Sequence, residues 1–143
     1  MNIVEKLREI TEGFGWKFFY GRKDFQNLVE ADSEDDVKWY FFLDPITTDD
    51  TNPNIPIHSG YFMILSKSDL DQIYDGQKET DINNGKWRTN ILPKRQFIKN
   101  EFRNAIECDG DLEVTASRVT DVINFFDENF DGILNSFSIK QYV

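Results

Sequence analysis

The sequence predicts an α+β fold in which an antiparallel sheet of about five strands packs against two helices, in the order α-β-β-β-α-β-β. Two segments, 2–12 and 91–110, place apolar residues at helical spacing. Several short runs rich in aromatic or β-branched residues have the length of strands. The last two runs, 112–126 and 132–143, are joined by Asp, Asn and Gly, which are typical of hairpin turns. Such a sheet buries one face by packing helices against it.

The length and composition predict a single folded domain spanning residues 1–143. A chain of 143 residues can bury roughly two thirds of the surface that it exposes when unfolded. The aromatic content of 15% is far above that of a disordered chain. A Gly/Ser-rich or Pro-rich linker that would divide the chain is absent from the sequence.

The N-terminal part predicts an amphipathic helix followed by aromatic strands. In residues 2–12, Ile3, Leu7 and Ile10 share one face, and Gly13 with Gly15 ends the pattern. The run WKFFYG (16–21) has strand length, and DFQNLVEA (24–31) alternates less clearly. The acidic stretch EADSEDD (30–36) looks like a hairpin connection into VKWYFFLD (37–44), a strand that Pro45 closes.

The middle of the chain predicts a long loop and one further strand. Residues 45–58 hold three of the four prolines and lack periodicity, so we expect an irregular loop or an extended arm. Loops of this length in small domains are often functional. GYFMILSK (60–67) reads as a strand, and 66–90 is polar, with one helical turn expected near 70–74.

The C-terminal part predicts the second helix and a closing pair of strands. The helix at 91–110 carries a row of apolar residues: Ile91, Phe97, Ile98, Phe102, Ala105 and Ile106. In 112–126 the even-numbered apolar residues alternate with polar neighbours, although positions 119–126 also fit a helix; these residues are Leu112, Val114, Ala116, Val122 and Phe126. The final segment, 132–143, alternates again and reads as a strand.

The stretch DENFDGIL (127–134) begins like a calcium-binding EF-hand loop. Such a loop also needs a bidentate Glu at its twelfth position, where this chain has Ser138, and an exiting helix. The stretch is closer to a dockerin-type loop, but only one half-motif is present. The sequence therefore favours a turn formed by Asp127, Asn129, Asp131 and Gly132, and a weak Ca²⁺ site on the three side chains is the alternative.

The sequence contains few features that are typical of a catalytic site, so we expect neither enzymatic activity nor a cofactor. His58 is the only histidine and has no carboxylate or nucleophile at a motif spacing. Cys108 reads as a small buried residue. We interpret Trp16, Trp39 and Trp87 as core residues rather than ligand-stacking groups.

The charge pattern bears on partners and location. The net charge is −10, and PKRQFIK (93–99) is the only local basic excess, so general nucleic-acid binding is disfavoured. A single cysteine and a charged N-terminal segment lead us to expect a reducing compartment and no signal peptide. No stretch approaches the length of a membrane span, so no membrane partner is expected.

The closing segment VTDVINFFDENFDGILNSFSI (119–139) resembles the final hairpin of tail-terminator and tail-completion (head–tail joining) proteins of tailed bacteriophages. Other elements agree in order: a YG-x-x-x-F-x-N-L stretch (20–28), the aromatic strand WYFFLDP (39–45), an apolar strand YFMIL (61–65), and a helix that begins near FIKNEF (97–102). The resemblance covers most of the chain as an order of elements and is sharpest at its end.

The resemblance implies a non-enzymatic virion structural protein, made in the host cytoplasm and located in the tail or neck. Its subunits would form a homo-oligomeric ring, usually a hexamer, that joins the tail tube to neck or connector proteins. DNA would pass through the ring lumen without specific binding, and an acidic lumen would keep it from sticking. We expect the final strand and the long loop to supply the subunit interface by strand addition or by embracing the neighbour, with these apolar residues: Ile46, Ile55, Ile57, Phe137, Ile139 and Tyr142.

Two other functions remain open at this point. The first is a soluble partner-binding module with a degenerate EF-hand or dockerin-like Ca²⁺ loop at 127–138. The second is a small intracellular enzyme, which would need carboxylates from elsewhere in the fold to surround His58.

Overall fold

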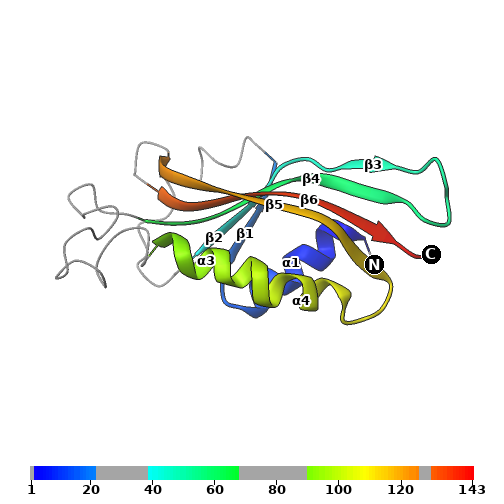
Figure 1. Cartoon of the computed structure of the whole chain (residues 1–143), viewed down its shortest axis with the longest axis horizontal. Coiled ribbons are helices and arrows are strands. Elements are labelled where there is room, and N and C mark those ends of the chain that lie inside the picture. The colour runs from blue at the N-terminus through cyan, green and yellow to red at the C-terminus, as the bar shows by residue number, and fades with distance from the viewer. Residues whose placement is uncertain (1, 22–38, 68–89, 126–129) are drawn as a thin grey trace.

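The computed structural model describes residues 2–21, 39–67, 90–125 and 130–143, without the side chains of 123–125. It confirms the α+β class, with a six-stranded sheet and two helices on one of its faces (Figure 1). The elements in chain order are α1 (Ile3–Gly13), β1 (Lys17–Tyr20), β2 (Tyr40–Leu43), β3 (Thr47–Asp49), β4 (Ile57–Lys67), α3 (Leu92–Phe97), η3 (Ile98–Phe102), α4 (Arg103–Glu107), β5 (Leu112–Phe125) and β6 (Phe130–Gln141).

The strand order is β1-β2-β4-β6-β5, and β3 pairs with the beginning of β4. Two features of this sheet differ from the prediction. β1 and β2 pair in parallel, whereas a wholly antiparallel sheet was expected. The final strand β6 lies inside the sheet between β4 and β5, so it is not the exposed edge that the sequence suggested. The expected strand-like run at 24–31 and the expected helical turn at 70–74 lie outside the described residues.

The first helix, α1, matches its predicted range within one residue. The Asn2 side chain accepts a hydrogen bond from the Glu5 backbone N–H at 3.0 Å and so caps the first turn. Ile3 and Leu7 are buried against the sheet. After the helix, Gly15 takes a φ of +82°, a backbone geometry that glycine adopts without strain, and turns the chain into β1.

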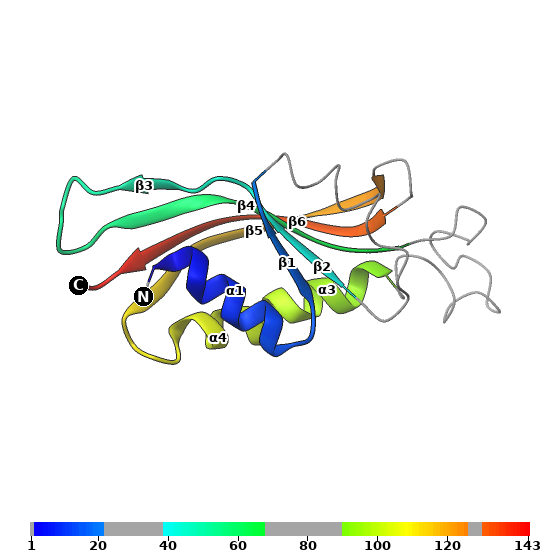
Figure 2. The same cartoon turned by 180° about the vertical axis from the view of Figure 1, so that it is seen from behind.

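The second helix runs without interruption through α3, η3 and α4. Its middle segment, η3, is one wide π turn. Insertions of this kind are frequent at functional positions. Here the π turn keeps Phe97 and Phe102, five residues apart, on the same buried face. Figures 1 and 2 show both helices on the same face of the sheet.

The β5–β6 hairpin confirms the closing strands and corrects their phase. A β-bulge between Val114 and Ala116 adds an unpaired residue, Thr115, to β5. The bulge reverses the alternation, because an extra residue turns each later side chain to the other face. Val114 is buried in the core under the helices, whereas Ala116, which the even-numbered pattern assigned to the core, is exposed.

Two apolar clusters lie on the two faces of the sheet. The larger cluster joins the helices to the sheet through residues such as Leu7, Phe62 and Ile106. The smaller cluster lies on the other face and contains Tyr40, Phe42, Met63, Leu65 and Phe130. None of the described helices is both long and apolar enough to cross a membrane.

Candidate functional site

The long Pro-containing segment folds as an arm rather than as an irregular loop. We define the arm as β3, residues 50–56 and the first residues of β4. β3 pairs with β4 from Thr47↔Ser59 to Asp49↔Ile57. The tip at 49–54 is exposed, and the arm extends past the helices at the end of the sheet where both chain termini lie (Figure 1).

Backbone bonds from the C-terminal residues hold the arm in the sheet. Gln141 N–H donates to Pro56 O at 2.9 Å, and Val143 N–H donates to Asn54 O at 3.0 Å. Within the tip, Asp49 accepts from both the backbone N–H and the hydroxyl of Thr51, at 3.0 and 2.6 Å. These two bonds lower the pKa of Asp49. The tip therefore presents an ordered turn with an ionised carboxylate.

His58 links three strands of this region. Its Nδ1 lies 2.8 Å from the Thr48 hydroxyl in β3, and its Nε2 lies 2.9 Å from Oε1 of Gln141 in β6. The amide oxygen can only accept, so Nε2 donates and Nδ1 accepts from the hydroxyl. The imidazole is buried, and its hydrogen bonds tie β3 and β6 to β4 in the arm.

On the opposite edge of the sheet, a groove of about 360 Å³ lies between the second helix and β5. Its floor is apolar and its rim carries three cations. The residues that line it are Arg95, Ile98, Lys99, Phe102, Arg103, Val114, Ser117 and Val119. The predicted basic excess at 93–99 contributes two of the cations. We call this site the basic groove.

Carboxylates of the same chain neutralise part of the rim. The Arg95 Nε lies 2.6 Å from Asp121 Oδ1, and Arg103 Nη1 lies 3.7 Å from Glu107 Oε2. Arg103 also donates to the carbonyl of Val114 at 3.1 Å. Lys99 is exposed and makes no ion pair within the described ranges. Among the described residues, the basic groove thus keeps one ammonium without a carboxylate partner beside apolar surface.

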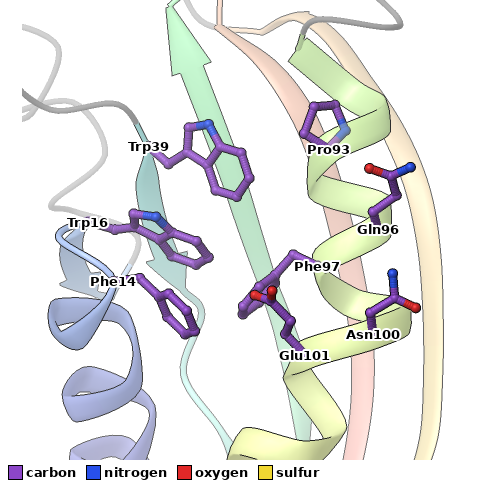
Figure 3. Close-up of a pocket in the computed structure, with 8 residues that line it drawn as sticks. All are labelled: Phe14, Trp16, Trp39, Pro93, Gln96, Phe97, Asn100 and Glu101. Atoms are coloured by element: carbon purple, nitrogen blue, oxygen red, sulfur yellow. The ribbon is translucent and has the colours of Figure 1, made fainter.

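A second hollow, of about 420 Å³, lies between the α1–β1 turn and the second helix. Figure 3 shows Phe14, Trp16 and Trp39 side by side along one wall, with residues of the helix opposite them. The Trp16 ring lies 5.3 Å from Phe14, 4.9 Å from Trp39 and 4.7 Å from Phe97, measured between ring centroids.

We call this second hollow the aromatic pocket. Its helix side carries both aromatic and polar side chains. Phe97 meets the stack edge-on and is buried, while the polar side chains Gln96, Asn100 and Glu101 form the rim. Phe14 is 48% exposed, and Trp16 and Trp39 are half-buried. The pocket can accept a small apolar or aromatic side chain. The interpretation of Trp16 and Trp39 as core residues is therefore only partly right, and Trp87 lies outside the described residues.

A buried polar cluster lies beside this pocket. Lys94, on α3, is fully buried and donates to the Ser66 hydroxyl at 2.8 Å and to the carbonyl of Asn90. Its ammonium lies 5.0 Å from the Trp39 ring centroid. Asp131 is buried as well and accepts from the Asn90 amide at 3.2 Å.

Burial lowers the pKa of Lys94 to about 7, against the opposing effect of the Asp131 carboxylate. A lysine with such a pKa can act as a base or nucleophile when a substrate reaches it. Lys94 has no exposed surface, and it donates hydrogen bonds to Ser66 and Asn90. In this arrangement it links α3 to Ser66 of β4 and to the Asn90 carbonyl through hydrogen bonds.

The residues expected at a subunit interface lie in two different places, some in or near the arm and some in the core. Ile46, Ile55 and Ile57 are half-buried in or next to the arm, and Tyr142 is 45% exposed. Phe137 and Ile139 are buried in the core under the helices. In this structure the side chains of these two residues are therefore not available to a neighbouring subunit.

The structure also contradicts part of the prediction of a turn at 127–132. Asp127 and Asn129 lie outside the described residues, between β5 and β6. Asp131 and Gly132 are strand residues of β6 rather than turn residues, and the Asp131 carboxylate is bound to Asn90. In the described ranges, no group of three or more His, Cys, Asp or Glu side chains gathers as a metal site.

Cys108 was expected to be buried but is exposed at the end of α4. Its thiol lies 3.4 Å from the carbonyl of Ala105 and 3.8 Å from Asp109 Oδ1.

Sequence reasoning missed the basic groove and the aromatic pocket as sites. The basic run at 93–99 was a signal for the groove, but the strand that forms its other wall could not be identified. Comparison with known proteins adds no assignment: no protein-family model matches the chain, and no curated protein matches it significantly.

Proposed function

We propose that this chain is a structural subunit of a tailed-bacteriophage virion, of the tail-terminator or head–tail joining class. It acts by assembling into a homo-oligomeric ring between the tail tube and the neck proteins, not by catalysis. The observation that carries this proposal is the position of the arm and of β5 on opposite edges of one sheet.

Opposite edges are what a ring subunit requires. A head-to-tail contact uses two different surfaces of each subunit, and it closes into a ring when the rotation between neighbours is suitable. In the described part of the chain, β5 pairs only with β6 and β3 pairs only with β4. As far as the described strands go, each edge therefore has backbone groups available for a neighbouring subunit.

The shape of the arm supports the same role. It is anchored by the bonds from Gln141 and Val143, so a neighbour would meet a preformed surface and less conformational entropy would be lost on binding. The resemblance of the closing hairpin and of the element order to tail-terminator proteins points in the same direction.

The calcium-binding alternative loses support from the structure. Asp131, one of its three proposed ligands, is buried in a strand and is held by Asn90. A Ca²⁺ ion would have to displace this hydrogen bond and compete with the neighbouring Lys94.

The test is the mass of the purified full chain in solution, measured by light scattering over a wide range of concentrations. Each sample is measured with excess Ca²⁺ and with a chelator, and particles are viewed by negative-stain electron microscopy. We expect closed rings of several subunits that neither additive changes. A chain that stays monomeric at every concentration, or that assembles only with Ca²⁺, would contradict the proposal.

A further inference from the structure

We propose that the basic groove is the docking site for the acidic tip of the arm from a second copy of this chain. The inference rests on the proposed function and specifies the contact that would join neighbouring subunits. It pairs Asp50 of one copy with Lys99 of the next, and it places the exposed residues around Pro53 over the apolar floor of the groove.

Charge is the first support. The arm holds Asp49 and Asp50, and the range 44–58 contains no lysine or arginine. Asp49 is engaged by Thr51, whereas Asp50 is exposed and makes no ion pair or hydrogen bond within the described residues. The groove offers the opposite charge, since Lys99 has no carboxylate partner in the part of the chain that the structure describes. Opposite charges across an interface favour the correct partner and speed its association.

Size and chemistry are the second support. The groove has an apolar floor of Ile98, Phe102, Val114 and Val119. Its volume of about 360 Å³ is at the low end of the range for ligand clefts, so it holds a few side chains rather than a whole helix. The arm tip carries polar residues and an exposed proline, Pro53. An acidic turn with a small apolar side chain matches both the rim and the floor.

Topology decides that the occupant comes from another copy. The arm lies on the β3 side of the sheet and the groove lies against β5, on the other side of β4 and β6. The hydrogen bonds that Asn54 and Pro56 accept hold the arm along its own sheet. It therefore cannot turn back into its own groove without breaking them, but the arm of a neighbour in a head-to-tail ring can reach it.

The first experiment reverses the two charges, with assembly measured by analytical ultracentrifugation. We expect Asp50→Lys and Lys99→Glu each to weaken the apparent association constant at least tenfold, and the double variant to recover most of the loss. Glu9→Lys, at an exposed acid of α1, is the control for the change in net charge. Single variants that assemble like this control would overturn the inference while leaving a ring-forming function in place.

The second experiment detects the contact itself and does not depend on ring closure. In a Cys108→Ser background, a chain with Asp50→Cys is mixed with a chain with Lys99→Cys under mild oxidation. We expect a disulfide-linked dimer in the mixture, with much less in either chain alone. Cross-linking without rings would support the contact between arm and groove and contradict the proposed ring. Rings without cross-linking would contradict this contact and support the proposed ring. Circular dichroism checks that every variant is folded.

Discussion

Gly132 in β6 lies directly against the carbonyl group of Ile64 in β4: a Cβ built on Gly132 would sit 1.8 Å from the Ile64 oxygen. The register partner of Gly132 in this antiparallel pair is Leu65, the residue that follows Ile64. No side chain fits at this distance, since a real Cβ essentially never comes within 3.0 Å of such an atom. The glycine is therefore required by the close approach of two strands and not by a turn.

This contact predicts a large effect of Gly132→Ala. The methyl group would force β4 and β6 apart at the centre of the sheet, and we expect a loss of more than about 3 kcal/mol in the free energy of unfolding. Chemical denaturation measures it. Gly13→Ala is the matched control, because its Cβ would meet nothing within 4 Å, and a helical alanine is favoured by up to about 1 kcal/mol. Equal stabilities of the two variants would refute the steric argument.

The buried Lys94 predicts a pH dependence of stability. Its pKa falls from 10.5 in the unfolded chain to about 7 in the folded chain, with burial as the largest cause and the Asp131 charge in opposition. Between these two values the unfolded state binds more protons, so the contribution of Lys94 to the free energy of unfolding rises with pH. The full rise is on the order of 4–5 kcal/mol.

The measurement is urea denaturation from pH 6 to pH 10 for the wild type and Lys94→Met. We expect the stability of the wild type relative to this variant to increase through the window. Lys67→Met, at an exposed lysine at the end of β4, is the control for losing a lysine. A difference between wild type and Lys94→Met that does not change with pH would show that Lys94 is not desolvated.

The ion pair between Lys6 and Asp109 predicts an acid-labile link between the two helical segments. Lys6 Nζ lies 2.5 Å from Asp109 Oδ2, and the hydrogen bond raises the pKa of the lysine and lowers that of the carboxyl. The stabilisation by the carboxylate is present above its unfolded pKa of 3.8 and is lost as the pH falls through the lower folded value. We expect Asp109→Asn to lower the Tm at pH 7 and to have little effect at strongly acidic pH.

Thermal unfolding at both pH values checks this expectation, with Glu9→Gln as the control at an exposed acid of α1. A loss in Asp109→Asn that is the same at both pH values would exclude the carboxylate charge as its cause.

Phe97 and Phe14 predict unequal effects from the same substitution. Phe97 is 5% exposed, and its ring meets Phe14, Trp16 and Phe102. We expect Phe97→Ala to cost about 3–5 kcal/mol, because it leaves a cavity between the second helix and the sheet. Phe14 is 48% exposed, so Phe14→Ala should cost far less while opening the aromatic pocket. Chemical denaturation, followed by tryptophan fluorescence, compares the free energies of unfolding of the two variants. Similar losses of stability would place Phe97 outside the core.

Local patterns in the sequence were sufficient to predict the class of the fold and most of its helices and strands. The helical spacing of Ile3 and Leu7, and of Phe102 and Ile106, predicted both helices, and alternation predicted the closing hairpin. Such periodicities depend on one physical requirement, that a segment bury one of its faces. The arm at 45–58 was foreseen as a loop or arm because prolines interrupt regular pairing, although its β3–β4 ladder was not.

The tertiary structure decided what periodicity does not encode, namely which segments become neighbours. A buried strand has the same apolar pattern at an edge and in the interior of a sheet. The sequence therefore could not predict that β6 lies inside the sheet or that β1 pairs in parallel with β2. One inserted residue, Thr115, changed the phase of β5 without a local signal. The burial of Lys94 depends on Trp39, Ser66 and Asp131, all distant in sequence. The basic groove likewise exists only because a helix and a strand meet, and its proposed partner lies on the opposite edge of the sheet.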